Sequence, residues 1–137
     1  VDRERSASLL DAATVFADFR LDDRFSGAPA YLHGGVILAV LDEAMAWAAI
    51  AVAGQWAVTH TTSTTFDKPV RVDQPYRVEA RIDAIADDRI EASASVVDGR
   101  GTARVRSTAT FVALGTAEAI DAIGAVPTDA DTAFLRD

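Results

Sequence analysis

The stretch HGGVILAVLDEAMAWAAIAVAG at residues 33–54 constrains the fold of this chain most strongly. Every residue of 36–53 is apolar except two adjacent carboxylates, Asp42 and Glu43. An apolar surface on every face, with Gly54 as the stop, predicts one helix of about 27 Å that is buried on all sides. Each carboxylate would cost roughly 2.5–3.5 kcal/mol at the centre of a bilayer, which excludes a transmembrane helix. The helix is therefore expected inside a protein core.

Length and composition predict a single soluble domain over residues 1–137, with a core at about 14–114 and a tail at 115–137. Half of the residues are hydrophobic and a quarter are charged, as in globular proteins. The net charge of −8, without a Lys/Arg cluster, argues against a nucleic-acid surface. The absence of cysteine excludes disulfides, thiolate nucleophiles and cysteine zinc sites. The charged start, VDRERSASLL, is not typical of a signal peptide, so a cytoplasmic location is expected.

The remainder of the chain is dominated by predicted strands. Alternating or β-branched patterns predict strands at 14–22, 57–66, 76–83, 90–96 and 102–114. DGRG at 98–101 is a hairpin signal. One strand, one long helix and four further strands with short connections predict an antiparallel meander that wraps around the helix. The predicted fold class is α+β, in the arrangement called the hotdog fold.

From about residue 14 to 114, the chain resembles the PaaI-like acyl-CoA thioesterases of the hotdog superfamily. The resemblance rests on GAPAYLHGGVILAVLDEA at 27–44 and TTFDKPVRV at 64–72. An HGG motif opens the helix, and an acid follows nine residues after the histidine. The resemblance implies hydrolysis of an acyl-CoA or acyl-carrier-protein thioester, without a metal or cofactor and without a membrane partner. It also implies a homodimer or a dimer of dimers, with the active site at the subunit interface.

Apart from the resemblance, the spacing of His33 and Asp42 also bears on whether an active site is shared between two subunits. Nine residues on a helix correspond to half a turn after whole turns and to about 13 Å along the axis. Within one chain, the two side chains therefore lie on opposite faces and too far apart to act on one atom. If both serve one reaction, they must come from different subunits.

Each residue of the motif has an available chemical role. Gly34 and Gly35 open a helix, where free N–H groups and the helix dipole favour negative charge, as an oxyanion hole requires. The resemblance assigns the oxyanion contact to the N–H of Gly34. Asp42 is expected to act as the general base on water or as the nucleophile, and the sequence leaves both open. His33 either orients the site or the leaving thiolate, or simply caps the helix.

Further candidates surround this motif. Counting back from Pro69, the resemblance places Thr59 where related enzymes have a hydroxyl that holds the catalytic water. Gly35, Glu43 and Tyr31 are expected at the substrate site. Glu43 lies about 100° round the helix from Asp42, which favours a structural role, paired with an Arg or with polar groups across the interface. Large apolar side chains are assigned to the core, with some lining an acyl pocket: Met45, Trp47, Trp56 and Phe66.

The chain departs from the family pattern at Gly27. Many members have Asn or Gln at this position, six residues before the histidine, and Tyr31 and Ser26 are the nearby substitutes. CoA is polyanionic, so its binding requires a local basic patch, for which the candidates are Arg71, Arg100, Arg104 and Arg106. Two alternatives stay open: a non-catalytic hotdog domain that binds acyl-CoA or lipid, and a hotdog dehydratase or hydratase. The spacing of the HGG motif and the acid resembles the latter enzymes less.

Overall fold

A computed structural model of the protein describes residues 14–54 and 56–115. The elements follow the predicted order, and each predicted strand or helix is present with bounds that differ by a few residues at most. Of the predicted tail at 115–137, residues 116–137 lie outside the described residues. The elements are β1 (Val15–Phe19), η1 (Asp23–Phe25), α2 (Gly34–Ala53), β2 (Ala57–Phe66), β3 (Tyr76–Ala86), β4 (Arg89–Val97) and β5 (Ala103–Ala113).

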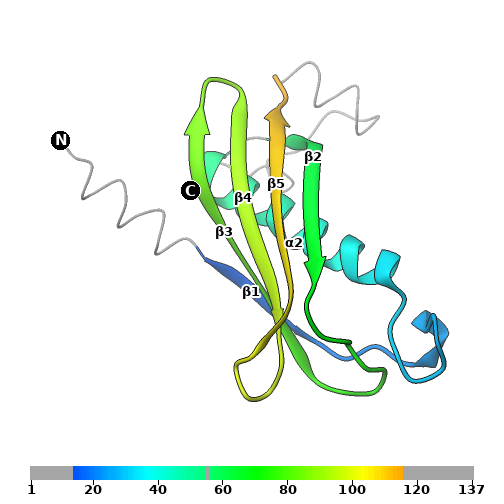
Figure 1. The fold of residues 1–137 in the computed structure, drawn as a ribbon. Helices are drawn as coiled ribbons and strands as arrows, with labels where there is room; N and C mark the ends of the chain where they lie inside the picture. Colours follow the sequence, from blue (N-terminus) through cyan, green and yellow to red (C-terminus); the bar gives the residue numbers. More distant parts are fainter. Residues whose placement is uncertain (1–13, 55, 116–137) are drawn as a thin grey trace, which may run out of the picture.

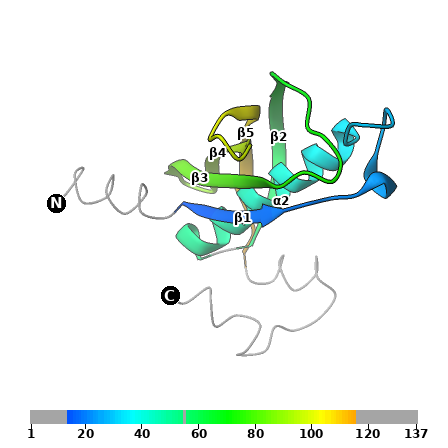
Figure 2. The ribbon, with the colours of Figure 1, turned by 90° about the horizontal axis from the view of Figure 1, so that it is seen from below.

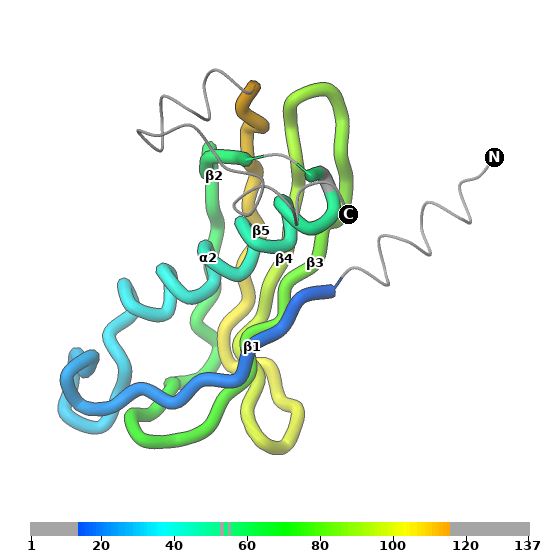
Figure 3. Tube along the Cα trace, turned by 180° about the vertical axis from the view of Figure 1, so that it is seen from behind, coloured from blue at the N-terminus to red at the C-terminus, as the bar shows by residue number. Residues whose placement is uncertain are grey.

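The five strands form one antiparallel sheet in the order β1-β3-β4-β5-β2. The helix α2 lies across one face of this sheet (Figures 1 and 3). The predicted antiparallel sheet around a long helix is therefore confirmed. The predicted meander is wrong for β2, which pairs with β5 rather than with the following strand, β3. β1 occupies the free side of β3, and β2, which is polar on both faces, forms the opposite edge of the sheet.

The core lies between α2 and the inner face of the sheet. Leu41 and Met45 on the helix have no exposed surface, and each contributes roughly 1.5–3 kcal/mol by burial. Alternate residues of β3 and β4 face them, including the small Ala80 and Ala92, both almost fully buried. The period-two patterns seen in the sequence thus correspond to one packed and one solvent-facing side of the sheet.

The outer face of α2 is uncovered within a single chain. Leu38 is 38% exposed and Trp47 is 47% exposed, and Phe66 at the end of β2 is also 47% exposed. The prediction that the helix is buried on all sides is therefore wrong for the single chain, as is the assignment of Trp47 and Phe66 to its core. A helix on one sheet is covered on one side only. Gly34–Val52 is long and apolar enough to cross a membrane, but here its buried side packs on the sheet.

Candidate active site

His33 caps the start of α2. Its backbone is extended, with φ −62° and ψ 135°, and its Nδ1 accepts a hydrogen bond of 2.9 Å from the Gly35 N–H. Its carbonyl accepts from the N–H groups of Val36 and Ile37 at 3.0 and 3.2 Å. An accepting Nδ1 assigns the ring proton of the neutral imidazole to Nε2. The capping interpretation of His33 is therefore correct, and its Nε2–H is the donor that the cap does not use.

The N–H of Gly34 has no hydrogen-bond partner within the described residues. A Cβ atom added to Gly34 would lie 3.6 Å from Cζ of Phe66, an ordinary contact, and the residue does not have a positive φ. Neither packing within the chain nor backbone conformation requires glycine at this position. What the glycine does provide is close access to the free N–H at the positive end of the helix dipole.

Gly35 is required by packing. A Cβ atom at this position would lie 3.1 Å from Nδ1 and 3.2 Å from Cε1 of His33. We expect Gly35→Ala to displace the imidazole and to lower the free energy of unfolding by about 1 kcal/mol, the usual cost of losing an N-cap. In a His33→Ala background, the same change is expected to be neutral or stabilising because no ring remains to be displaced. Urea unfolding of the four proteins measures both effects. An equal effect of Gly35→Ala in the two backgrounds would contradict the cap.

The structure brings Asp42 and Thr59 together. The Thr59 hydroxyl donates a hydrogen bond of 2.6 Å to Oδ1 of Asp42, joining the middle of α2 to the edge strand β2. Asp42 is half-buried, and Oδ2 takes no part in this bond. The register of β2 against β5 shifts between Thr59 and Thr61, and His60 is the exposed extra residue of this bulge. Bulges re-aim the side chains beside them. The pair therefore holds a carboxylate with one oxygen fixed and the other available.

Glu43 is separate from this pair. Its Oε1 accepts a hydrogen bond of 3.0 Å from Nε1 of Trp47, one turn further along the same helix. Within the described residues, its partner is an indole of its own helix and not an arginine. Pairing with polar groups across a subunit interface stays a prediction. Of the two adjacent carboxylates, only Asp42 is hydrogen-bonded to β2 in the part of the chain that the structure describes.

The loop before the helix lies against His33. A Cβ atom on Gly27 would be 3.4 Å from Cα of His33, at the short end of ordinary van der Waals contact. The Ser26 hydroxyl donates to the Asp23 carbonyl at 2.8 Å. The ring of Tyr31 lies beneath the guanidinium of Arg71, with its centroid 5.3 Å from Cζ. Ser26 and Tyr31, the proposed substitutes for an Asn or Gln side chain, therefore already have contacts of their own.

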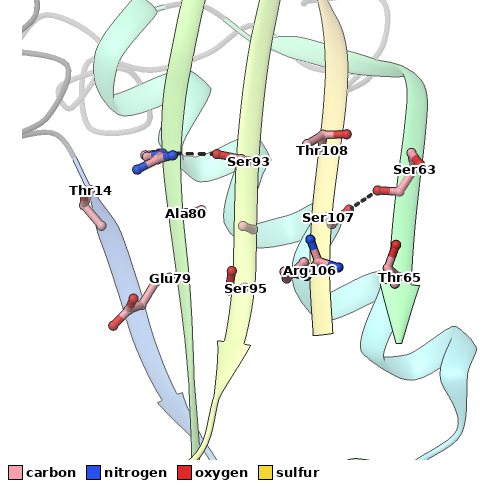
Figure 4. A pocket seen from close by; sticks show the side chains of 12 residues that line it. Thr14, Ser63, Thr65, Glu79, Ala80, Ser93, Ser95, Arg106, Ser107 and Thr108 are labelled. Carbon is pink, nitrogen blue, oxygen red and sulfur yellow. Dashed lines mark hydrogen bonds between the residues drawn. The ribbon is translucent and has the colours of Figure 1, made fainter. Parts of the chain in front are cut away.

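The two parts of the candidate site are separated within one chain. Gly34 and Asp42 are eight residues apart on α2, which corresponds to about 12 Å along the helix axis. A cavity of about 450 Å³ lies elsewhere, on the polar face of the sheet that points away from α2 (Figure 4). Its lining includes Ser95, Thr108 and Arg106, but neither Gly34 nor Asp42. The candidate site is therefore not part of this cavity.

Comparison with known proteins identifies the family. Residues 30–105 match the sequence profile described as the thioesterase superfamily, and the chain belongs to this superfamily. No curated protein matches the chain.

Solved structures share the fold at low sequence identity. Protein RHA08564, a thioesterase superfamily protein, has a TM-score of 0.69 and 23% identity over 74% of this chain. The matched region covers only 49% of that protein. The protein smu.793 from Streptococcus mutans UA159, bound to acetyl CoA, has a TM-score of 0.71 and 18% identity, covering 75% of this chain and 82% of that one. An acyl-CoA hydrolase from Staphylococcus aureus, in complex with butyryl coenzyme A, has a TM-score of 0.73 and 22% identity. The match covers 80% of this chain and 68% of that one. The hotdog thioesterase fold predicted from the sequence is confirmed.

Proposed function

We propose that this chain is an acyl-CoA thioesterase of the PaaI-like type. The observation that carries the proposal is the bond between Thr59 and Asp42, because it holds a carboxylate ready for base or nucleophilic chemistry in a member of the thioesterase superfamily. The structural neighbours bound to acetyl CoA and butyryl coenzyme A support CoA as the carrier of the acyl group. The proposed setting is the cytoplasm.

The proposed reaction consumes one water and needs no cofactor. Asp42 accepts a proton from water through Oδ2 while Thr59 holds Oδ1, and the water oxygen bonds to the thioester carbonyl carbon. The N–H of Gly34 stabilises the resulting oxyanion. The C–S bond then breaks, and the CoA thiolate leaves and takes up the proton that Asp42 accepted from water, which regenerates the carboxylate. Nε2–H of His33 can donate a hydrogen bond to the leaving sulfur without losing its proton. In the alternative course, Asp42 attacks the carbonyl itself and water hydrolyses the mixed anhydride.

The active site is proposed to form between two subunits. Exposed apolar side chains of α2, such as Leu38 and Trp47, give a homodimer apolar surface to bury, and β2 forms a free strand edge of the sheet. When two α2 helices pack antiparallel about a two-fold axis, they run in opposite directions. The start of one helix can then lie beside the middle of the other, although Gly34 and Asp42 of one chain are about 12 Å apart. Gly34 of one chain then lies near Asp42 of the partner subunit. A dimer of dimers would repeat this arrangement.

Release of CoA thiol from a panel of aliphatic and aromatic acyl-CoAs tests the proposal. The same samples are examined by analytical ultracentrifugation, so that turnover can be assigned to a dimer or larger assembly. We expect hydrolysis of at least one substrate by the assembled protein and none by a monomer. A folded dimer that binds CoA but releases no thiol from any substrate would instead favour the non-catalytic binding domain.

A further inference from the structure

Most arginines of the described residues are already engaged by carboxylates. The six in ion pairs are Arg24, Arg77, Arg81, Arg89, Arg104 and Arg106. Arg104 is held by Asp98 and by the Pro69 carbonyl, and the hydrogen bond from Arg106 lowers the pKa of Asp67. The positive charges of Arg104 and Arg106 are therefore already paired, which makes these two residues poor candidates for the expected basic patch.

Arg71 differs from these arginines in its surroundings. Within the described residues it forms no ion pair, and Cζ of its guanidinium lies over the ring of Tyr31. Its backbone N–H donates to the Tyr76 hydroxyl at 2.9 Å, and the preceding Val70 is only 2% exposed. The backbone of Arg71 is thus anchored while its side chain is exposed. A cation–π contact with an aromatic face does not use the N–H groups of a guanidinium, which can bind an anion in bidentate fashion.

Arg71 is also held close to the start of α2. Residues 70–72 run antiparallel to 30–32, with hydrogen bonds from the Leu32 N–H to the Val70 carbonyl and from the Val72 N–H to the Ala30 carbonyl. Tyr31 and Arg71 form the bridge between these segments. Figure 2 shows the connection between β2 and β3 beside the start of α2. This register keeps Cα of Arg71 within about 17 Å of Gly34, a distance that an extended pantetheine arm and the arginine side chain can span.

We propose that Arg71, lying over the ring of Tyr31, binds a phosphate group of CoA and thereby selects CoA thioesters over thioesters that lack the nucleotide. The inference rests on the proposed function, because it assumes that the thioester carbonyl binds at Gly34. It assigns the local positive charge that a polyanionic carrier requires on a protein with a net charge of −8. Arg71 is thus a specificity-determining residue, and the chemistry at Asp42 does not involve it.

Two ligands distinguish recognition of the phosphate groups of CoA from recognition of its pantetheine arm. Calorimetric binding of CoA and of pantetheine, which lacks the phosphates and nucleotide, is compared for wild type, Arg71→Ala and Arg71→Lys. We expect Arg71→Ala to weaken CoA binding about tenfold and to leave pantetheine binding unchanged, since a hydrogen-bonded charge contact is lost only with CoA. Arg71→Lys keeps the charge without the planar fork and is expected to lie between them. The matched control is Arg89→Ala, which makes the same charge change at the start of β4.

Thiol release from an acyl-CoA and from the corresponding acyl-pantetheine is measured in parallel. An Arg71→Ala protein that binds CoA as tightly as wild type would overturn the inference, even if both thioesters were hydrolysed normally. An equal loss of CoA and pantetheine binding would also overturn it, because that result indicates a structural role. If CoA binding depends on Arg71 but neither thioester is hydrolysed, the inference stands and the proposed hydrolysis fails.

Discussion

Replacing Asp42 by asparagine is expected to lower kcat by about 10²–10⁴-fold, the range typical for loss of a general base. The asparagine carbonyl can still accept the hydrogen bond from Thr59, so the connection between α2 and β2 is preserved. What the amide cannot do is take up a proton from water or form an anhydride. The measurement is thiol release under substrate saturation, with urea unfolding and sedimentation to verify that fold and assembly are unchanged.

The matched control is Glu43→Gln, the same chemical change at the adjacent residue. The glutamine carbonyl can still accept from Nε1 of Trp47, and the Thr59 hydroxyl donates to Asp42 rather than to Glu43. We expect its kcat to remain close to that of wild type. A large loss of turnover in Glu43→Gln together with normal turnover in Asp42→Asn would contradict the proposal, because it would show that Glu43 and not Asp42 carries the chemistry.

Replacing Gly34 by proline is expected to lower kcat by about 10²–10³-fold, because it removes one N–H donor and adds no charge. Gly34 is the first residue of α2, where proline is favoured because its N–H is not needed by the helix. His33 already has the extended conformation that a residue before proline prefers. The free energy of unfolding is therefore expected to be unchanged or slightly raised. Kinetics and urea unfolding together distinguish loss of the donor from loss of the fold.

Gly34→Ala is the companion variant because it keeps the N–H. The added Cβ atom makes only an ordinary contact with Phe66, at 3.6 Å. We expect Gly34→Ala to retain much more activity than Gly34→Pro. Equal activity of Gly34→Pro and wild type would show that the oxyanion is stabilised elsewhere.

The local structure was predictable because it depends on nearby residues. The apolar run at 36–53 and the glycine that follows it predicted α2 closely, and Gly54 has the left-handed conformation of a C-cap, with φ 67°. The alternation in 76–83 predicted the buried face of β3. In the candidate site, the cap at His33 also followed from the motif. The choice of Gly34 and Asp42 as site residues followed from the motif together with the family resemblance.

The tertiary contacts were not predictable from these patterns. In the sheet, β1 lies beside β3 and β2 lies beside β5, and no local pattern in the sequence distinguishes this order from a meander. Whether Thr59 meets Asp42 depends on a bulge whose only local trace is one extra residue, His60. The exposed residues of α2 are mostly apolar, as the buried ones are, and Glu43 is the charged exception. A sequence that is apolar all round therefore cannot separate burial within a chain from burial between chains.

The most direct test of the account is complementation between two inactive variants. Gly34→Pro and Asp42→Asn chains are each assayed alone and then after mixing under conditions that exchange subunits. If each site combines Gly34 of one chain with Asp42 of the partner subunit, a mixed dimer contains one intact site, and random mixing restores about a quarter of wild-type activity. If both residues act within the same chain, every site in the mixture lacks one of them. Activity no higher than that of the separate variants, in a mixture shown to contain mixed dimers, would contradict the shared site.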